Sequence, residues 1–105
     1  MIMQNTTFYI PVDSRKSFIE CLKREYLRVL DDLGYKGRYN FWRLMVPHGF
    51  EDEEETYAVS VLFDTKEQAD EWIENKLVEI LDRIYGKFGK PGNPLYYISI
   101  MEDVV

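Results

Sequence analysis

His48 is the one histidine of the chain, and two acidic residues, Glu51 and Asp52, follow it closely. A histidine beside a carboxylate can serve as a general base, because the carboxylate stabilises the protonated imidazole. Pro47 and Gly49 flank it, however, and they place it in a turn between two predicted strands. We therefore favour a solvated loop histidine over a catalytic one.

All five residues from Glu51 to Glu55 are acidic. Carboxylates could bind a metal ion or attract a basic partner, but one histidine and one flexible run do not promise a ligand set of fixed geometry. Charge clusters in hairpin turns commonly just keep a sheet edge hydrated. We expect no metal and no cofactor. The sequence also contains no glycine-rich phosphate loop, nucleophile elbow or zinc pattern.

Cys21 and Arg43 are the two remaining candidates for reactive chemistry. Cys21 is the only cysteine, so no intramolecular disulfide can form, and its place beside the apolar stripe of a predicted helix indicates a buried structural thiol. Arg43 interrupts an apolar strand, so its guanidinium either reaches the rim of the sheet or pairs with a carboxylate or a ligand anion. We favour the rim and keep the second alternative open.

The element around which the chain is organised is the apolar run from Tyr57 to Phe63. Its residues are β-branched, aromatic, aliphatic or small and uncharged, which is typical of a central strand. A helix start follows at once, with two possible capping boxes, Asp64 with Glu67 or Thr65 with Gln68.

Periodicity and turn residues predict five further elements. They are a strand over residues 1–10, a helix starting at Asp13 or Ser14 and stopped by Gly34, a strand over 38–46, a second helix that frays near residues 86–89, and a strand over 95–101 after the turn 90–94. The apolar stripe of the first helix is predicted at Phe18, Leu22, Tyr26, Val29 and Leu33.

The order βαββαβ predicts an α+β, ferredoxin-like fold, in which a four-stranded antiparallel sheet carries both helices on one face. The 105 residues suffice for one domain, residues 1–105, with its own core. The bulkier alternate residues of the last two strands, such as Val59 and Ile98, are predicted to face the helices. For residues 38–46 the pattern does not decide between Trp42, Leu44 and Val46 on one side and Phe41, Arg43 and Met45 on the other.

The other face of the sheet is predicted to hold small and hydroxyl residues with aromatic and aliphatic ones around them. Because it is neither charged nor fully apolar, we expect a second copy of the chain to cover it, with room for a small-molecule ligand between. An ordinary hydrated face is the alternative. The predicted homodimer interface is Thr7, Tyr9, Ala58, Ser60, Leu62, Tyr97, Ser99 and Met101, and the predicted ligand site is Tyr9, Trp42, Arg43, Ser60 and Tyr97.

Charge and hydropathy exclude two classes of partner. Nineteen acidic against 13 basic residues give a net charge of −6, which repels nucleic acid and anionic lipid. No apolar run approaches the length of about 18 residues that a membrane span needs, and the N-terminus does not resemble a signal peptide. We expect a soluble cytoplasmic protein that binds neither nucleic acid nor membranes.

Weak motifs spread along the chain carry a family resemblance. They are Asn5-Thr6-Thr7-Phe8, Phe18 with Leu22-Lys23 and Tyr26-Leu27, Trp42-Arg43-Leu44, Thr56-Tyr57-Ala58-Val59 and Phe88-Gly89. In these the sequence resembles domain-of-unknown-function family 4286. The resemblance implies a small bacterial protein of the dimeric α/β-barrel kind, with no established activity and so no catalytic residues to carry over. The turn 47–55 and the insertion 91–94 depart from the family pattern.

Two functional hypotheses follow. The first is a non-catalytic homodimer that acts through interaction or small-ligand binding. The second is a cofactorless enzyme of the dimeric barrel type, with Tyr9, Ser60, Tyr97 and Arg43 or Trp42 lining its cavity. A cavity with a tyrosine or Arg43 pointing into it and a perturbed pKa would favour the enzyme.

Overall fold

A computed structural model describes residues 1–45, 54–89 and 95–104 of the chain. Its sheet has four antiparallel strands in the order β2-β3-β1-β4, which confirms the predicted ferredoxin-like fold. The strands are β1 (Ile2–Pro11), β2 (Tyr39–Arg43), β3 (Glu54–Phe63) and β4 (Tyr96–Glu102). The predicted central strand is β3, which lies between β2 and β1.

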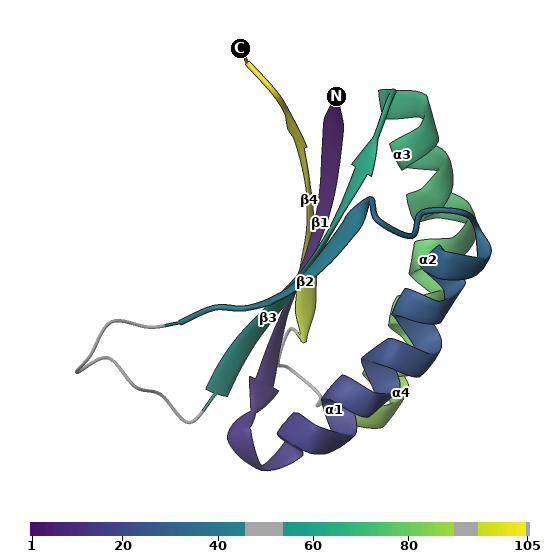
Figure 1. The fold of residues 1–105 in the computed structure, drawn as a ribbon. Helices are drawn as coiled ribbons and strands as arrows, with labels where there is room; N and C mark the ends of the chain where they lie inside the picture. The colour runs from purple at the N-terminus through teal and green to yellow at the C-terminus, as the bar shows by residue number, and fades with distance from the viewer. Residues whose placement is uncertain (46–53, 90–94, 105) are drawn as a thin grey trace.

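Two long helices cover one face of the sheet, and none of the described helices lies on the opposite face (Figure 1). The first runs through η1 (Val12–Ser14), α1 (Arg15–Leu22), η2 (Lys23–Leu27) and α2 (Arg28–Asp32), and the second through α3 (Lys66–Trp72), η3 (Ile73–Leu77) and α4 (Val78–Phe88). Both η2 and η3 are π turns. In each, the residue that follows donates its N–H to a carbonyl five residues back, Arg28 to Lys23 and Val78 to Ile73.

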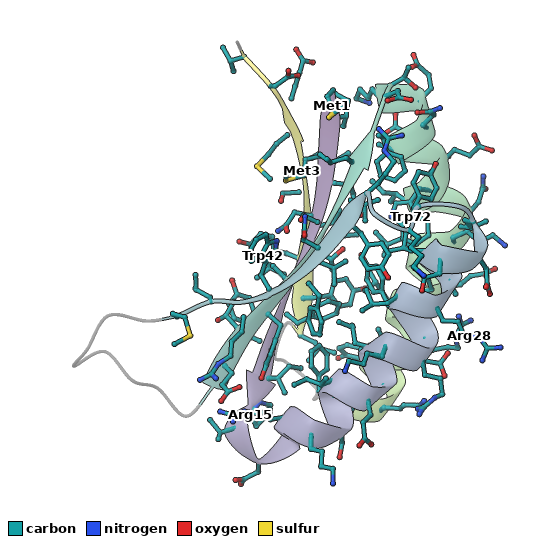
Figure 2. All side chains as sticks on the ribbon, in the orientation of Figure 1. Met1, Met3, Arg15, Arg28, Trp42 and Trp72 are labelled. Atoms are coloured by element: carbon teal, nitrogen blue, oxygen red, sulfur yellow. The ribbon has the colours of Figure 1, made fainter. Side chains whose placement is uncertain are left out.

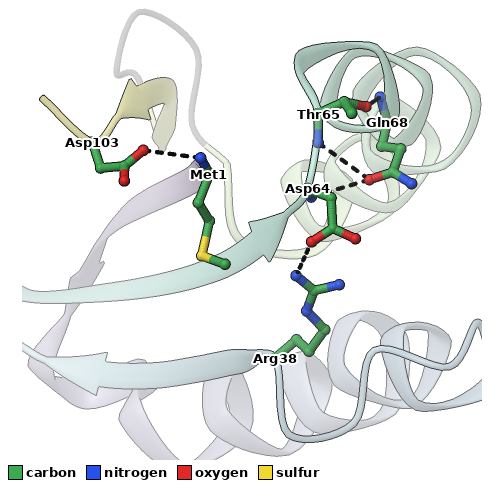
Figure 3. A network of polar contacts seen from close by, with 6 residues as sticks. All are labelled: Met1, Arg38, Asp64, Thr65, Gln68 and Asp103. Carbon is green, nitrogen blue, oxygen red and sulfur yellow. Dashed lines mark hydrogen bonds and ion pairs between the residues drawn. The ribbon is translucent and has the colours of Figure 1, made fainter. Parts of the chain in front are cut away.

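A capping box begins the second helix and a glycine ends the first, whereas Ser14 at the start of α1 makes no side-chain capping hydrogen bond. Of the two possible capping boxes, the one between Thr65 and Gln68 forms: the Gln68 N–H donates to Thr65 Oγ1 at 3.2 Å, and Gln68 Oε1 accepts from the Thr65 N–H at 3.3 Å (Figure 3). Gly34 ends the first helix as predicted. Its φ of +90° is left-handed, and the Tyr35 N–H reaches back to the Leu30 carbonyl.

The apolar stripe of the first helix differs from the prediction at its C-terminal end. Leu30 is fully buried, whereas Leu33 is 45% exposed and Val29 is only half-buried. The reason is η2: its wide turn holds an additional residue, so a spacing of four from Phe18 through Leu22 and Tyr26 continues onto Leu30. The rest of the core between the helices and the sheet is built from residues of β1, β3 and the second helix, such as Phe8, Val59 and Leu81.

The register of β2 settles the undecided alternation. Phe41 pairs with Val59 and Arg43 with Tyr57, so these residues share the helix-covered face, while Trp42 pairs with Ala58 on the other. Val46 lies outside the described residues, as do Pro47, His48 and Gly49. The predicted turn 90–94 also lies outside them.

Candidate functional site

The face of the sheet without helices, called here the open face, is the first candidate site. It receives every second residue of the strands: Met3 pairs with Leu62 and Met101, Asn5 with Ser60 and Ser99, and Thr7 with Ala58 and Tyr97. All the residues predicted for an interface therefore share one face. They are Thr7, Tyr9, Ala58, Ser60, Leu62, Tyr97, Ser99 and Met101.

Two tyrosines and a tryptophan form the aromatic end of the open face. The rings of Tyr9 and Tyr97 stack with centroids 6.1 Å apart, and about half of Tyr97 is exposed. Burial first, and then the hydrogen bond with Tyr97, raise the pKa of Tyr9. Its phenol consequently stays protonated near neutral pH and can donate a hydrogen bond, but it is a poor general base.

The middle of the open face is polar and uncharged. Trp42 Nε1 donates to Ser60 Oγ at 3.3 Å, and Asn5 Nδ2 donates to Thr7 Oγ1 at 2.9 Å. Thr7 and Ser60 are largely buried already, whereas Trp42 is 56% exposed. Trp42 lies on the side of the sheet away from the helices (Figure 2). This arrangement can exchange hydrogen bonds with a neutral molecule, and it has no group suited to hold an ion.

The opposite end of the open face is rich in methionine. A shallow cleft of about 250 Å³ is lined by Met1, Met3, Leu62 and Met101, with Glu102 and Asp103 at its border. The ammonium group of Met1 donates to the Asp103 carboxylate at 2.9 Å (Figure 3). Unbranched thioether side chains adapt to many shapes, which suits a surface that another molecule covers.

Arg43 does not belong to the open face, so its assignment to a ligand site there is wrong. An odd-numbered residue of β2 must face the helices, because β2 pairs Arg43 with Tyr57. Its guanidinium lies 3.7 Å from Glu55 Oε1, and Arg15 of α1 contacts the same carboxylate through two nitrogens. The remaining predicted ligand residues, Tyr9, Trp42, Ser60 and Tyr97, do share the open face.

Glu55 is the centre of this second polar cluster. Its two oxygens accept hydrogen bonds from Arg15 and from the Tyr57 hydroxyl, and its side chain is 9% exposed. Arg15 first, and then Tyr57 and Arg43, lower the pKa of Glu55 to about 2. The carboxylate is therefore ionised under all ordinary conditions.

A buried hydrogen-bonded chain links the sheet to both helices, and sequence reasoning missed it. Trp72 Nε1 donates to Gln4 Oε1 at 2.9 Å, Gln4 Nε2 donates to Thr6 Oγ1 at 2.9 Å, and the hydroxyls of Thr6 and Tyr26 lie 2.8 Å apart. Burial raises the pKa of Tyr26 well above its usual value. The sequence did contain a signal for this chain. Gln4 and Thr6 alternate along β1 in step with Phe8 and Ile10, which places all four side chains on the helix-covered face.

The other sequence candidates carry no chemistry in the part of the chain that the structure describes. Cys21 is buried as predicted, with Lys87 Nζ 3.9 Å from its sulfur. His48 and most of the acidic run, Glu51 to Glu53, lie outside the described residues. Within those residues no three histidine, cysteine or carboxylate side chains cluster as metal ligands. Nor does any of the described helices combine the length and hydropathy of a membrane span.

Element order, strand order and helices on one face of the sheet define a ferredoxin-like fold (Figure 1). The chain belongs to the family described as Domain of unknown function (DUF4286), whose model matches residues 1–104. This confirms the family resemblance seen in the sequence. A search among curated proteins found no match.

Solved structures with the same fold are similar to this chain over nearly its whole length. An ethyl tert-butyl ether d (EthD) family protein from Bacillus halodurans C-125 has a TM-score of 0.63 at 12% identity, covering 99% of this chain and 100% of its own. A protein from Arabidopsis thaliana has a TM-score of 0.64 at 14% identity, with 98% and 96% covered. An antibiotic biosynthesis monooxygenase has a TM-score of 0.59 at 6% identity, with both chains fully covered. At such identities the likeness concerns the fold alone.

Proposed function

We propose that the protein is a homodimer in which the open faces of two copies pack together and enclose a small, uncharged ligand. Its role would be binding rather than catalysis. The predictions of a bacterial origin and of a cytoplasmic location stay predictions.

The observation that carries this proposal is the composition of the open face. Lysine, arginine, aspartate and glutamate make up 30% of the chain, yet none is among the outward residues of β1 from Met3 to Tyr9, of β2, of β3 from Thr56 to Leu62, or of β4 from Tyr97 to Met101. Large side chains are exposed there instead, namely Trp42, Tyr97 and Met101. A continuous uncharged and partly apolar surface is typical of an interface.

The fold favours a second copy as the partner. The open face of a dimeric α/β-barrel type sheet is the surface through which two sheets can close into one barrel, and closure would remove water from the aromatic and methionine ends together. Methionine sulfur and aromatic rings, both abundant here, also make favourable contacts with each other.

A ligand would solve the problem that such closure creates at the polar middle. Thr7 and Ser60, which are already largely buried, and the amide of Asn5 would lose their remaining contact with water, and buried polar groups need hydrogen-bond partners. An uncharged molecule with hydroxyl or carbonyl groups could bridge them and Tyr9. The cofactorless enzyme has less support, because Arg43 lies on the other face and the raised pKa of Tyr9 disfavours a tyrosinate base.

Light scattering across a dilution series tests the dimer. The wild-type chain should have twice its monomer mass of 12.6 kDa. Tyr97→Lys puts like charges into the interface and should raise the dimer dissociation constant at least about a hundredfold. The matched control is Val78→Lys, a similarly exposed apolar position on α4, which should leave the dimer intact.

A wild-type protein that is monomeric at every concentration would overturn the proposal. A Tyr97→Lys variant as dimeric as the wild type would also overturn it, because association would then use another surface. Circular dichroism of both variants shows whether each keeps the fold.

A further inference from the structure

A second pocket lies on the helix-covered side of the sheet, between α1 and the edge strand β2. Its volume is about 240 Å³, and Arg15, Ile19, Phe41, Trp42, Arg43 and Tyr57 line it. The pocket exists because the helices pack mainly over β1 and β3, so the inward side chains of β2 are only partly covered. Among these lining residues Trp42 also belongs to the open face, whereas Arg15, Ile19, Phe41, Arg43 and Tyr57 lie on the helix-covered side, so binding at those five residues does not require the dimer.

The walls of this pocket are apolar and rigid. Phe41 packs on Tyr57 with ring centroids 5.8 Å apart, and Tyr57 in turn packs on Phe18 at 5.4 Å. Tyr57 is 3% exposed, so its ring is held by the core, and Ile19 forms the wall on the α1 side. A flat, apolar group would find contact on several sides here.

Among the described side chains around this pocket, the charges do not cancel. Two guanidinium groups, from Arg15 and Arg43, meet a single carboxylate, that of Glu55. Arg15 and the Tyr57 hydroxyl already satisfy both oxygens of Glu55 by hydrogen bonds. Counted together, the residues that line the pocket and Glu55 therefore carry one net positive charge, whereas the whole chain carries a net charge of −6.

Arg43 carries that excess charge. Among the described residues its ion-pair partner is Glu55, at 3.7 Å, which is beyond hydrogen-bond distance. About half of its side chain is exposed, so its donors can turn toward a ligand without breaking the bond between Arg15 and Glu55. Arginine presents a planar fork of N–H groups that fits the two oxygens of a carboxylate.

We propose that this pocket binds a small carboxylate with a flat apolar body, the carboxylate on Arg43 and the body between Ile19, Phe41 and Tyr57. The volume limits the ligand to about one ring, because it lies below the range of about 300–1,000 Å³ typical of drug-sized ligands. Glu55 is a positioning residue. Its bonds hold Arg15 and Tyr57 in place, and its negative charge keeps Arg43 over the mouth.

Benzoate is the probe, and two-dimensional NMR of the ¹⁵N-labelled protein is the measurement. Benzoate should shift the signals of Arg15, Ile19, Phe41, Arg43 and Tyr57 in a saturable manner. Benzamide keeps the ring without the charge and acetate keeps the charge without the ring, so each should bind at least about tenfold more weakly.

Arg43→Gln should raise the dissociation constant of benzoate about tenfold, which is the expected effect of one partly exposed charge-assisted contact. The matched control is Arg38→Gln, just before the other end of β2. Arg38 pairs with Asp64 at 2.9 Å, away from the pocket (Figure 3), and its loss should change benzoate binding less than twofold.

Benzoate shifts that fall outside the pocket would overturn the proposal, as would an Arg43→Gln variant that binds benzoate like the wild type. Equal binding of acetate or benzamide would overturn the combined recognition of charge and ring. The titration can be repeated on Tyr97→Lys, so a failed dimer and a failed pocket are distinguishable.

Discussion

The two faces of β1 carry nearly the same chemistry and have opposite surroundings. Gln4, Thr6 and Phe8 point to the helices, and Asn5, Thr7 and Tyr9 point to the open face. Each set is an amide, a threonine and an aromatic residue in the same order. The difference in what covers them, and not the residue types, decides whether they stabilise the fold or are available to a partner.

On the helix-covered face all three residues, Gln4, Thr6 and Phe8, already have their hydrogen-bond or packing partners. Gln4 and Thr6 are fully buried within the hydrogen-bonded chain from Trp72 to Tyr26, and Phe8 packs edge-on against Phe18 at 5.2 Å. On the open face, and among the described residues, the Asn5 side chain bonds to Thr7, two residues along the same strand, and Tyr9 stacks on a half-exposed Tyr97. These groups retain capacity for further contacts.

The largest expected effect comes from truncating the two aromatic residues. Phe8→Ala should lower the free energy of unfolding by about 3–5 kcal/mol, because it leaves a cavity in a close-packed core. Tyr9→Ala should lower that of the monomer by about 1 kcal/mol. Urea unfolding of both variants in the Tyr97→Lys background, at low protein concentration, removes the contribution of association. Similar losses of unfolding free energy in the two variants would contradict the described difference between the two faces.

Replacing the two amides gives a smaller and more specific contrast. Gln4→Leu should cost about 2 kcal/mol, because the buried indole N–H of Trp72 loses its acceptor. Asn5→Leu should cost less than about 0.5 kcal/mol, since its amide is accessible to water. In a double-mutant cycle, Gln4→Leu with Trp72→Phe should cost less than the sum of the single changes. Strict additivity would contradict the hydrogen bond.

The smallest expected effect concerns Glu55, at the edge of the covered face. Its pKa of about 2 in the folded protein lies below its ordinary 4.5, so its ionised form stabilises the fold above pH 4.5, and this contribution is lost as the pH falls toward 2. Glu55→Gln should cost about 1.5 kcal/mol at pH 7 and little near pH 2. Urea midpoints of both proteins from pH 7 to pH 2 measure the difference, which should shrink on acidification. A difference independent of pH would exclude the charged interaction.

The fold was accessible from the sequence because its strands alternate clearly. Val59 and Val61 against Ala58 and Ser60 allow only one orientation of β3, and the same holds for Tyr96 and Ile98 of β4. In residues 38–46 each alternating set mixes aromatic and other apolar residues with polar or charged ones, so only the register of β2 with β3 places Trp42 on the open face and Arg43 on the other.

The candidate sites were less accessible, since they depend on contacts between distant segments. Arg15 and Glu55 are 40 residues apart, and Gln4 and Trp72 are 68 apart. No spacing rule connects such pairs. Buried Gln4 and Thr6 also run against the expectation that inward residues are apolar, and only their shared hydrogen bonds make their burial acceptable.

The two π turns determine where the chain can change in length. An α-helix turns about 100° per residue, so losing one residue would rotate all later side chains of the helix by that angle and turn the apolar ones away from the core. Loss of one of residues 23–25 in the first π turn is different, because the buried spacing of four, four and four from Phe18 to Leu30 would become four, three and four, that of an ordinary α-helix. Together with Ile73–Leu77 in the second helix, this gives the protein two internal positions at which a deletion leaves both halves of a helix facing the sheet.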